Sequence, residues 1–420
     1  MTTKERVAPL AIHGGTRWRA HPFPARGHIG PDEKAAIVAL MDDAIASGAA
    51  PGYNGEEEMA YCAEFAAYLG GGYADAVNSG TTAIYVGLKA LGLPAFSEVI
   101  VGAVTDPGGI MPIPLLNLIP VVADVAPGSY NTSAAQIEAL ITPLTSAIVV
   151  PHIGGEPADI EAIVAVARKH NLRLLEDCAQ AHGTKINGKL VGTFGDVAAF
   201  STMSGKHHCT GSQGGVVYTK SETLYQEIRR QSDRGKPFFL PSGATNNTAS
   251  LNLNLNDMAA AIGRVQLRKL PDLVTRRQVV VTMLGEGFED LPTVSLPPLL
   301  PEAEASYWFL RLRFHAAAAT CDKDTFCQAL MAEGLPINPS YRAALPHTMA
   351  WFVERNVFGS SGYPWTSADY KGDATRQFPC PNAHAVMEDH FHLQIHENWR
   401  ASDIDDAIAI FQRVDQYYHR

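Results

Sequence analysis

Seven short segments of almost continuously apolar residues lie between residues 73 and 220, and helical segments separate most of them. A strand that is apolar at nearly every position is buried on both of its faces. Such strands, separated by helices, are typical of a mostly parallel sheet covered on both sides. The chain is therefore predicted to be an α/β protein with a mostly parallel, seven-stranded sheet. The predicted strands are residues 73–77, 98–104, 119–125, 145–154, 173–180, 196–202 and 214–220.

The segments that follow this sheet predict a second domain. A chain of 420 residues is long for one compact domain. We expect an N-terminal arm over residues 1–31, a large domain over 32–260, and a linking helix with a small α+β domain over 261–420. The predicted helices are 32–48, 55–70, 255–291 with a break at Pro271, 322–334 and 402–418; residues 306–314 are predicted as a strand and 335–400 as irregular loops.

The charge and cysteine patterns exclude several classes of partner. The chain has 33 basic and 43 acidic residues and no lysine- or arginine-rich run, which disfavours nucleic acid and anionic membranes. Its six cysteines are scattered without a Cys-x-x-Cys pair, as expected of reduced thiols. The first residues lack the apolar region of a signal peptide. We therefore expect a soluble, cytoplasmic protein.

Polar residues with chemical potential follow two of the predicted strands. Ser79, Gly80, Thr81 and Thr82 lie between a strand and a helix, where backbone N–H groups and hydroxyls can bind a phosphate. An ordinary helix N-cap is the alternative. Asp177 ends an apolar strand, and a buried carboxylate needs a cation. That cation could be a protonated ring nitrogen or an Arg or Lys side chain.

A single lysine, Lys206, lies in the glycine-rich turn SGKHHCTGSQGG. A desolvated lysine has a lowered pKa and can form a Schiff base with an aldehyde, whereas a solvated loop lysine does neither. The turn lacks the first glycine and the final hydroxyl of an ATP-binding phosphate loop. Taken together, a lysine, a carboxylate and a helix N-terminus are what pyridoxal 5'-phosphate requires. Their order along the chain is that of fold-type I enzymes of this cofactor.

From about residue 30 to 275 the chain resembles the DegT/DnrJ/StrS family of sugar aminotransferases. The segments that carry the resemblance are NSGTTAI, VVPHIGGEPADIEAI, LLEDCAQAHGTKINGKLVGTFGDVAAFST and LNLNLNDMAAAIGRVQLRKL. The resemblance implies a fold-type I large domain, a smaller C-terminal domain and a homodimer with shared active sites.

The resemblance also implies a role for each matching residue. Lys206 would bind the cofactor's aldehyde, Asp177 would pair with its ring nitrogen, and Gln180 would lie beside the ring. The phosphate would be held by the side chains of Thr81 and Ser201, the backbone of Gly80 and Thr82, and Asn252 of the other subunit.

Three positions depart from the family pattern. Asp106 lies where an aromatic residue usually packs on the cofactor, so ring packing must come from elsewhere, or Asp106 contacts the substrate. Gln213 replaces a glutamate, and Asn254 lies where an arginine is common. We also expect His207, His208, Tyr307 and Tyr341 near the substrate. The spacing of His390, His392 and His396 could bind zinc, but it also suits one face of a strand, and packing or substrate contact is favoured over a metal.

The predicted function is transfer of an amino group from glutamate or glutamine to a keto group of a sugar, a nucleotide-sugar or a cyclitol. The resemblance places such a reaction in secondary-metabolite or surface-polysaccharide biosynthesis. A dehydratase of the same fold is an alternative; such relatives typically replace the lysine by histidine, so Lys206 argues against it despite the neighbouring His207. A non-catalytic, cofactor-binding regulatory protein is the second alternative.

Overall fold

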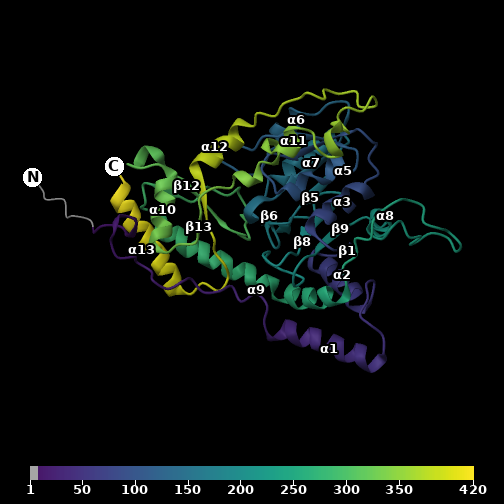
Figure 1. Cartoon of the computed structure of the whole chain (residues 1–420), viewed down its shortest axis with the longest axis horizontal. Helices are drawn as coiled ribbons and strands as arrows, with labels where there is room; N and C mark the ends of the chain where they lie inside the picture. Colours follow the sequence, from purple (N-terminus) through teal and green to yellow (C-terminus); the bar gives the residue numbers. More distant parts are fainter. Residues whose placement is uncertain (1–7) are drawn as a thin grey trace, which may run out of the picture.

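All seven predicted strands form one sheet in the computed structural model, which describes residues 8–420 (Figure 1). The first seven residues of the predicted arm lie outside the described residues. Only β9 runs antiparallel to its neighbours, so the predicted mostly parallel sheet is confirmed. The spatial order is β1 (Tyr73–Val77), β9 (Gly215–Thr219), β8 (Val197–Ser201), β5 (Arg173–Asp177), β4 (Thr145–Pro151), β2 (Glu98–Gly102) and β3 (Ile119–Ala123).

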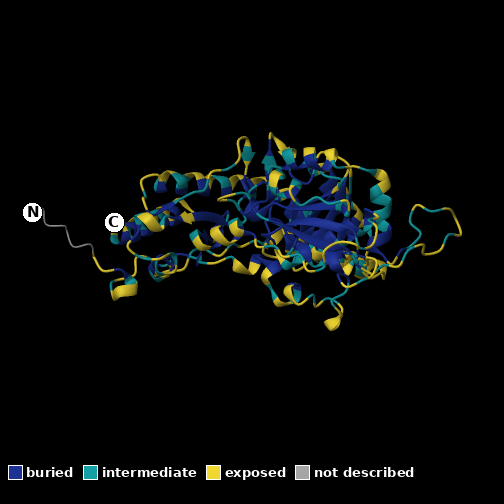
Figure 2. Cartoon of the chain, turned by 90° about the horizontal axis from the view of Figure 1, so that it is seen from above, coloured by how far each residue is buried: buried dark blue, intermediate teal, exposed yellow. Residues whose placement is uncertain are grey.

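Helices cover both faces of this sheet, which explains why its strands are continuously apolar. Val99 and Val101 of β2 pack with α3 on one face, whereas Ile100 between them packs with α7 on the other. The sheet is accordingly buried at the centre of the molecule (Figure 2). The helices within this part of the chain are α1 (Pro31–Ser47), α2 (Glu56–Tyr68), α3 (Gly80–Ala90), α4 (Pro107–Ile110), α5 (Pro112–Leu115), α6 (Ala134–Glu138), α7 (Ile160–Lys169) and α8 (Glu222–Ser232).

A second, antiparallel sheet follows the long helix α9 (Asp257–Phe288). Its strands pack with α9, α10 (Lys323–Glu333) and α13 (Ala401–Tyr418) around a core that includes Leu312 and Phe391. The order is β10 (Val294–Ser295), β12 (Leu310–Phe314), β14 (His390–Leu393) and β13 (Ile337–Asn338); a small third sheet holds β11 (Ala303–Glu304), β6 (Lys185–Ile186) and β7 (Lys189–Leu190).

Two sequence predictions in this region were wrong. The helix does not break at Pro271, because α9 continues through it while packing against α1, α2 and α13. The strand predicted over 306–314 begins only at Leu310. Residues Ser306 and Trp308 instead donate their backbone N–H groups to the carbonyls of Gly155 and Gly154, which belong to the turn after β4.

The segment after β13 returns to the large sheet rather than staying with the small one. Thr105 donates its backbone N–H to the carbonyl of Ala344, and Tyr370 donates its hydroxyl to the buried Glu98. Trp365 and Tyr370 pack on Ile119 of the edge strand β3. Residues 335–400 were predicted as irregular, yet besides this segment they contain α11 (Ala350–Val353), α12 (Pro381–Asp389) and β14. The domain division at residue 260 stays a prediction.

The described part of the N-terminal arm packs along the small sheet's side of the molecule. Leu10 is fully buried in the core beside α13, and Arg413 donates to the carbonyl of Pro9, so the start of the described arm lies beside the C-terminal helix (Figure 1). Over residues 8–420, no helix is long and apolar enough to span a membrane.

Candidate active site

A pocket opens at the carboxyl ends of the parallel strands, where ligands bind in sheets of this type. Its walls come from strand ends, the loops beside them and the first turn of α3, and they carry seven of the predicted site residues. The predicted residues that line the pocket are Gly80, Thr81, Asp106, Asp177, Gln180, Ser201 and Lys206; the others are Ser79, Ile84, Thr105, Gly108, Gly109, Pro151, His152, Ile153, Ala179, Met203 and Gln213.

The N-terminus of α3 forms one corner of the pocket. Ser79 caps the helix by accepting the N–H of Thr82, and the Thr82 hydroxyl turns back to Asn78 and Ser79, away from the pocket. Gly80 lies so close to Ser201 that a Cβ on residue 80 would be 2.6 Å from the Ser201 Cβ. The corner therefore brings the first N–H groups of a helix beside a serine hydroxyl, which is an arrangement suited to an anion.

Lys206 points its amine into a dry environment. The residue is only 7% exposed, and burial lowers its pKa to about 8 against the opposing attraction of Asp177 and Asp106. Its Nζ lies 3.8 Å from the ring centroid of Trp308. The lysine therefore has the desolvated amine that nucleophilic chemistry requires.

Asp177 ends β5 and is buried on the same side as Lys206. Burial raises the pKa of its carboxyl to about 6, although the N–H of Ala179 and the charge of Lys206 act in the opposite direction. The Ala179 N–H bonds to Oδ1, while Oδ2 accepts no hydrogen bond from the residues described. This free oxygen can serve a bound cation.

Gln180 is fixed at both ends of its amide. Its Oε1 accepts the N–H of Gly154 at 2.8 Å, and its Nε2 donates to the Tyr341 hydroxyl at 2.9 Å. Tyr341 thus lies directly behind the pocket wall. Because both hydrogen bonds constrain the amide, Gln180 presents one defined edge to the pocket.

Asp106 lines the pocket but is also a helix cap, because its Oδ1 accepts the N–H of Gly108 at the start of α4. Among the described lining residues, His152 has the one aromatic ring. His152 is therefore the lining residue whose ring could pack on a flat ligand.

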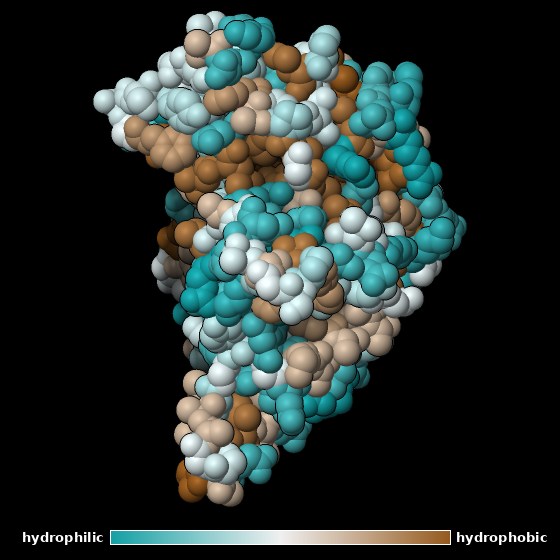
Figure 3. Space-filling view, turned by 90° about the vertical axis from the view of Figure 1, so that its right-hand side faces the viewer, coloured by the Kyte–Doolittle hydropathy of each residue, from teal (hydrophilic) through white to brown (hydrophobic). Residues whose placement is uncertain are grey.

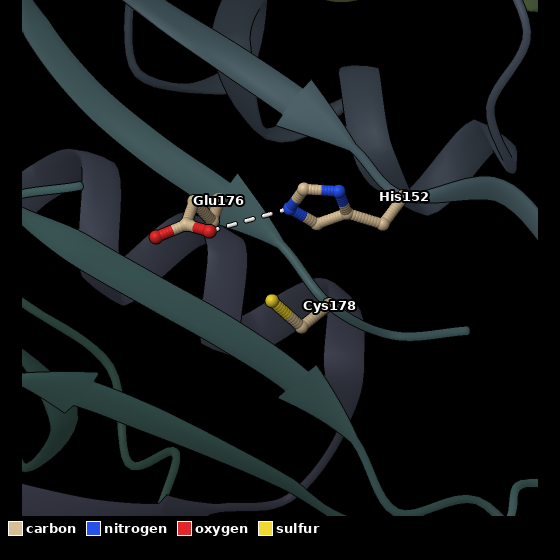
Figure 4. A group of neighbouring side chains, drawn as sticks. All are labelled: His152, Glu176 and Cys178. Atoms are coloured by element: carbon tan, nitrogen blue, oxygen red, sulfur yellow. Dashed lines mark hydrogen bonds and ion pairs between the residues drawn. The ribbon is translucent and has the colours of Figure 1, made fainter. Parts of the chain in front are cut away.

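His152 is held by a buried carboxylate on the neighbouring strand (Figure 4). Its Nδ1 accepts the N–H of Ala158, so the ring proton is on Nε2 and donates to Glu176 at 3.3 Å. The Glu176 oxygens also accept three backbone N–H groups, those of Gly192, Phe194 and Gly195. Cys178 completes a buried group that could hold a metal by proximity alone, but the carboxylate already serves to orient His152.

Several predicted residues lie outside the pocket. His207 and His208 are fully buried and bond to the Ser306 carbonyl and the Tyr61 hydroxyl. Tyr307 packs beside the small-sheet core, and Asn252 is exposed on the surface. His390, His392 and His396 bond to three different partners, namely Asp389, Tyr130 and the Pro24 carbonyl.

Two neighbours of the site were missed by the sequence interpretation. His152 follows β4 in VVPHIGG, and its position after a strand could have identified it. Trp308 lies about a hundred residues from Lys206 in sequence and inside a segment predicted as a strand, so no local signal connected the two.

The sheet order, the pocket at the strand ends and the antiparallel C-terminal sheet define an aminotransferase of fold-type I. The chain belongs to the DegT/DnrJ/EryC1/StrS aminotransferase family, whose model matches residues 31–412. Members of such families generally use pyridoxal phosphate.

The similarity to known proteins extends over most of the chain. The spore coat polysaccharide biosynthesis protein SpsC of Bacillus subtilis is 29% identical over 363 residues, which is 84% of this chain and 87% of that protein. GDP-perosamine synthase of Caulobacter vibrioides is 32% identical over 282 residues, 66% of this chain and 74% of its own. A solved aminotransferase of Psychrobacter cryohalolentis superposes with a TM-score of 0.80 at 25% identity, covering 95% of this chain and 100% of that one.

Proposed function

We propose that this protein is a homodimeric, pyridoxal-phosphate-dependent aminotransferase that transfers an amino group from glutamate or glutamine to a keto group of a sugar, a nucleotide-sugar or a cyclitol. The observation that carries the proposal is one pocket that holds the buried Lys206 amine, the Asp177 carboxylate and the N-terminus of α3. The names of two relatives concern a GDP-linked sugar and a coat polysaccharide, which supports a sugar acceptor.

The pocket residues fit this cofactor. The N–H groups that begin α3 and the hydroxyls of Thr81 and Ser201 would hold the phosphate, and the absence of a Cβ on Gly80 brings these groups together. Asp177 Oδ2 would accept the protonated ring nitrogen, and Lys206 would bind the aldehyde.

When bound, the cofactor supplies an aldehyde for the amino group and a ring that accepts the electron pair left by a departing proton. Asp177 would place a negative charge beside the ring nitrogen and so favour its protonated form. Lys206 would take the proton from the donor's α-carbon. Burial lowers the pKa of its amine to about 8, which favours the unprotonated form that this role requires. The same residues act in reverse order on the keto acceptor.

The dehydratase alternative requires a histidine in the position of the lysine. Lys206 is a lysine, and the neighbouring His207 is turned away into the core, where it bonds to Ser306. The pocket therefore favours amino transfer. The regulatory alternative predicts a bound cofactor that no amino donor converts.

The test is spectroscopic. We expect the protein with pyridoxal phosphate to show the visible absorption band of a lysine-bound cofactor, and glutamate or glutamine to bleach it. Lys206→Ala should lack the band, whereas Lys185→Ala, which removes an exposed lysine paired with Glu304, should keep it. A band that persists in Lys206→Ala would refute the lysine assignment. A normal band that neither donor bleaches would favour the regulatory protein.

A further inference from the structure

Three charged residues from distant parts of the chain meet behind the turn that carries Lys206. Glu397, which follows β14, accepts Arg26 Nε at Oε1 and Arg277 Nε at Oε2, both at 2.8 Å. The Glu397 and Arg277 side chains are 1% and 2% exposed, and that of Arg26 is 18% exposed. Buried charges in such a group are tolerated only when hydrogen bonds satisfy their remaining polar atoms.

Arg26 directs its free nitrogens at the backbone of the lysine turn. Nη1 donates to the Lys206 carbonyl at 2.7 Å and to the Gly205 carbonyl at 3.3 Å, and Nη2 donates to the His207 carbonyl at 3.1 Å. A planar guanidinium can contact three successive carbonyls at once, whereas a lysine ammonium cannot offer the same rigid fork. One side chain of the N-terminal arm thus fixes the backbone on both sides of Lys206.

Arg277 holds the segment that contacts the lysine amine. Its Nη1 donates to the carbonyls of Tyr307 and Trp308 at 2.7 and 3.3 Å. The Trp308 indole N–H donates to the Gly205 carbonyl at 2.9 Å, and the Trp308 ring lies 3.8 Å from Lys206 Nζ. The segment held by Arg277 therefore supplies the ring that the lysine amine contacts.

Glu397 and Arg277 stay charged at neutral pH. Burial would raise the pKa of Glu397, but Arg277 and Arg26 together hold it below its ordinary value. Burial lowers the pKa of Arg277 to about 10, still far above neutrality. The orientation of both guanidiniums by one carboxylate is therefore present throughout the neutral range.

We propose that Arg26, Glu397 and Arg277 form a clamp that positions Lys206 for reaction. The N-terminal arm is part of this clamp because it carries Arg26. This inference rests on the proposed function, because it assigns the clamp a role in amino transfer. The three are positioning residues, since they contact the lysine turn and the Trp308 segment rather than the pocket. A displacement of about 1 Å at a reacting group can lower a rate about a hundredfold.

The experiment compares Arg26→Ala and Arg26→Lys with Arg19→Ala. Arg19 is a matched control, because it also ties the arm to the small domain, through ion pairs with the buried Asp403 and the partly exposed Asp406, but does not touch the lysine turn. Three quantities are measured: the melting temperature, kcat, and the pH midpoint for capture of pyridoxal phosphate by Lys206. The last is measured in cofactor-free protein by borohydride trapping and peptide mass spectrometry.

We expect Arg26→Ala to lower kcat about tenfold to a hundredfold relative to Arg19→Ala. A loosened turn exposes the Lys206 amine to water, so the pH midpoint for cofactor capture should move upward, toward the value expected of an ordinary lysine. Arg26→Lys should recover the melting temperature through its pair with Glu397 but not kcat or the midpoint. If Arg26→Ala does not fold, the comparison of Arg26→Lys with Arg19→Ala provides the test.

Equal kcat and equal midpoints in the Arg26 and Arg19 variants would overturn the clamp. So would recovery of all three quantities by Arg26→Lys, which would indicate a purely structural ion pair. If wild-type protein neither captures the cofactor on Lys206 nor transfers amino groups, the proposed function fails instead.

Discussion

Asp177 and Lys206 hold charges in a pocket that disfavours them. Burial raises the pKa of Asp177 to about 6 and lowers that of Lys206 to about 8, so both shifts favour the neutral forms. A bound cofactor would present a cation to the first and an aldehyde to the second. In the absence of the cofactor, the two buried charges should lower the protein's free energy of unfolding.

Asp177→Asn should therefore stabilise the cofactor-free protein while abolishing most of its activity. The carboxyl has a folded pKa of about 6 against an ordinary 3.8, so its ionisation opposes folding by up to about 3 kcal/mol above pH 6. We expect the free energy of unfolding of the variant to exceed that of wild type by about 1–3 kcal/mol at pH 7.

The sign of this effect fixes its pH dependence. Between about pH 6 and pH 4 the folded wild type binds a proton that the unfolded chain has lost, so the penalty disappears as the pH falls. Urea unfolding at pH 7 and at pH 4 measures the change. If the difference in unfolding free energy between Asp177→Asn and wild type is the same at both pH values, burial of the Asp177 charge is not its cause.

The sequence could predict which residues lie near the pocket, but not which way each side chain points. Lys206 and His207 are adjacent, yet the lysine enters the pocket and the histidine enters the core. Asp177 was located because it ends a strand, whereas Gln180 and Ser201 were located by the family resemblance, and all three line the pocket. The direction of a side chain in an irregular turn depends on contacts such as that of His208 with Tyr61, which no local pattern encodes.

At the scale of elements, the start of α3 and the end of β8 must approach closely to form the anion corner. Gly80→Ala should separate them, because its Cβ would lie 2.6 Å from the Ser201 Cβ and 3.1 Å from its Cα. We expect a loss of about 1–3 kcal/mol in stability and a clearly weaker affinity for pyridoxal phosphate.

Gly52→Ala is the control for this substitution, because no atom lies within 4 Å of the Cβ it would add. Its stability should stay within about 0.5 kcal/mol of wild type. Chemical unfolding and fluorescence titration with the cofactor measure the two effects. Equal cofactor affinities of the two variants would show that the close contact does not form the site.

The large sheet was predictable in detail, and the small domain was not. Strands buried on both faces are apolar throughout, so their runs are visible without knowledge of their neighbours. Pro271 was misleading because packing along α9 outweighs the one hydrogen bond that a proline removes. The start of β12 depends on Gly154 and Gly155, which lie far away in the sequence.

At the scale of the whole molecule, apolar side chains remain exposed around the loop that follows α8 and at the start of α9. Phe239, Leu251 and Met258 are 56%, 59% and 44% exposed, and the exposed Asn252 directly follows Leu251. Viewed from this end, hydrophobic residues gather around a hollow in the upper part of the face (Figure 3). These features support the proposed homodimer with a shared site.

The shared site predicts complementation between two inactive variants. Lys206→Ala and Asn252→Ala should each lose most activity alone. If Asn252 serves the partner's pocket, a mixed dimer has one site with both defects and one intact site. Co-expression should then recover about a quarter of wild-type activity, because half of the dimers are mixed.

The assay is amino transfer by the co-purified mixture, with light scattering to confirm dimers. Lys206→Ala co-expressed with Asp177→Asn is the control, because both residues line the pocket of one chain and their mixed dimer has no intact site. Activity that does not rise in the Asn252 mixture would place Asn252 in its own subunit's site.

The return of residues 342–380 to the large sheet has a consequence for how the chain is made. The edge strand β3 is synthesised well before Trp365 and Tyr370, which pack on it and follow in the chain only after α9. Until then the nascent sheet presents an open edge to other chains, a state that invites aggregation. A chain that stalls before Trp365 lacks the residues that pack on this edge, however complete its sheet.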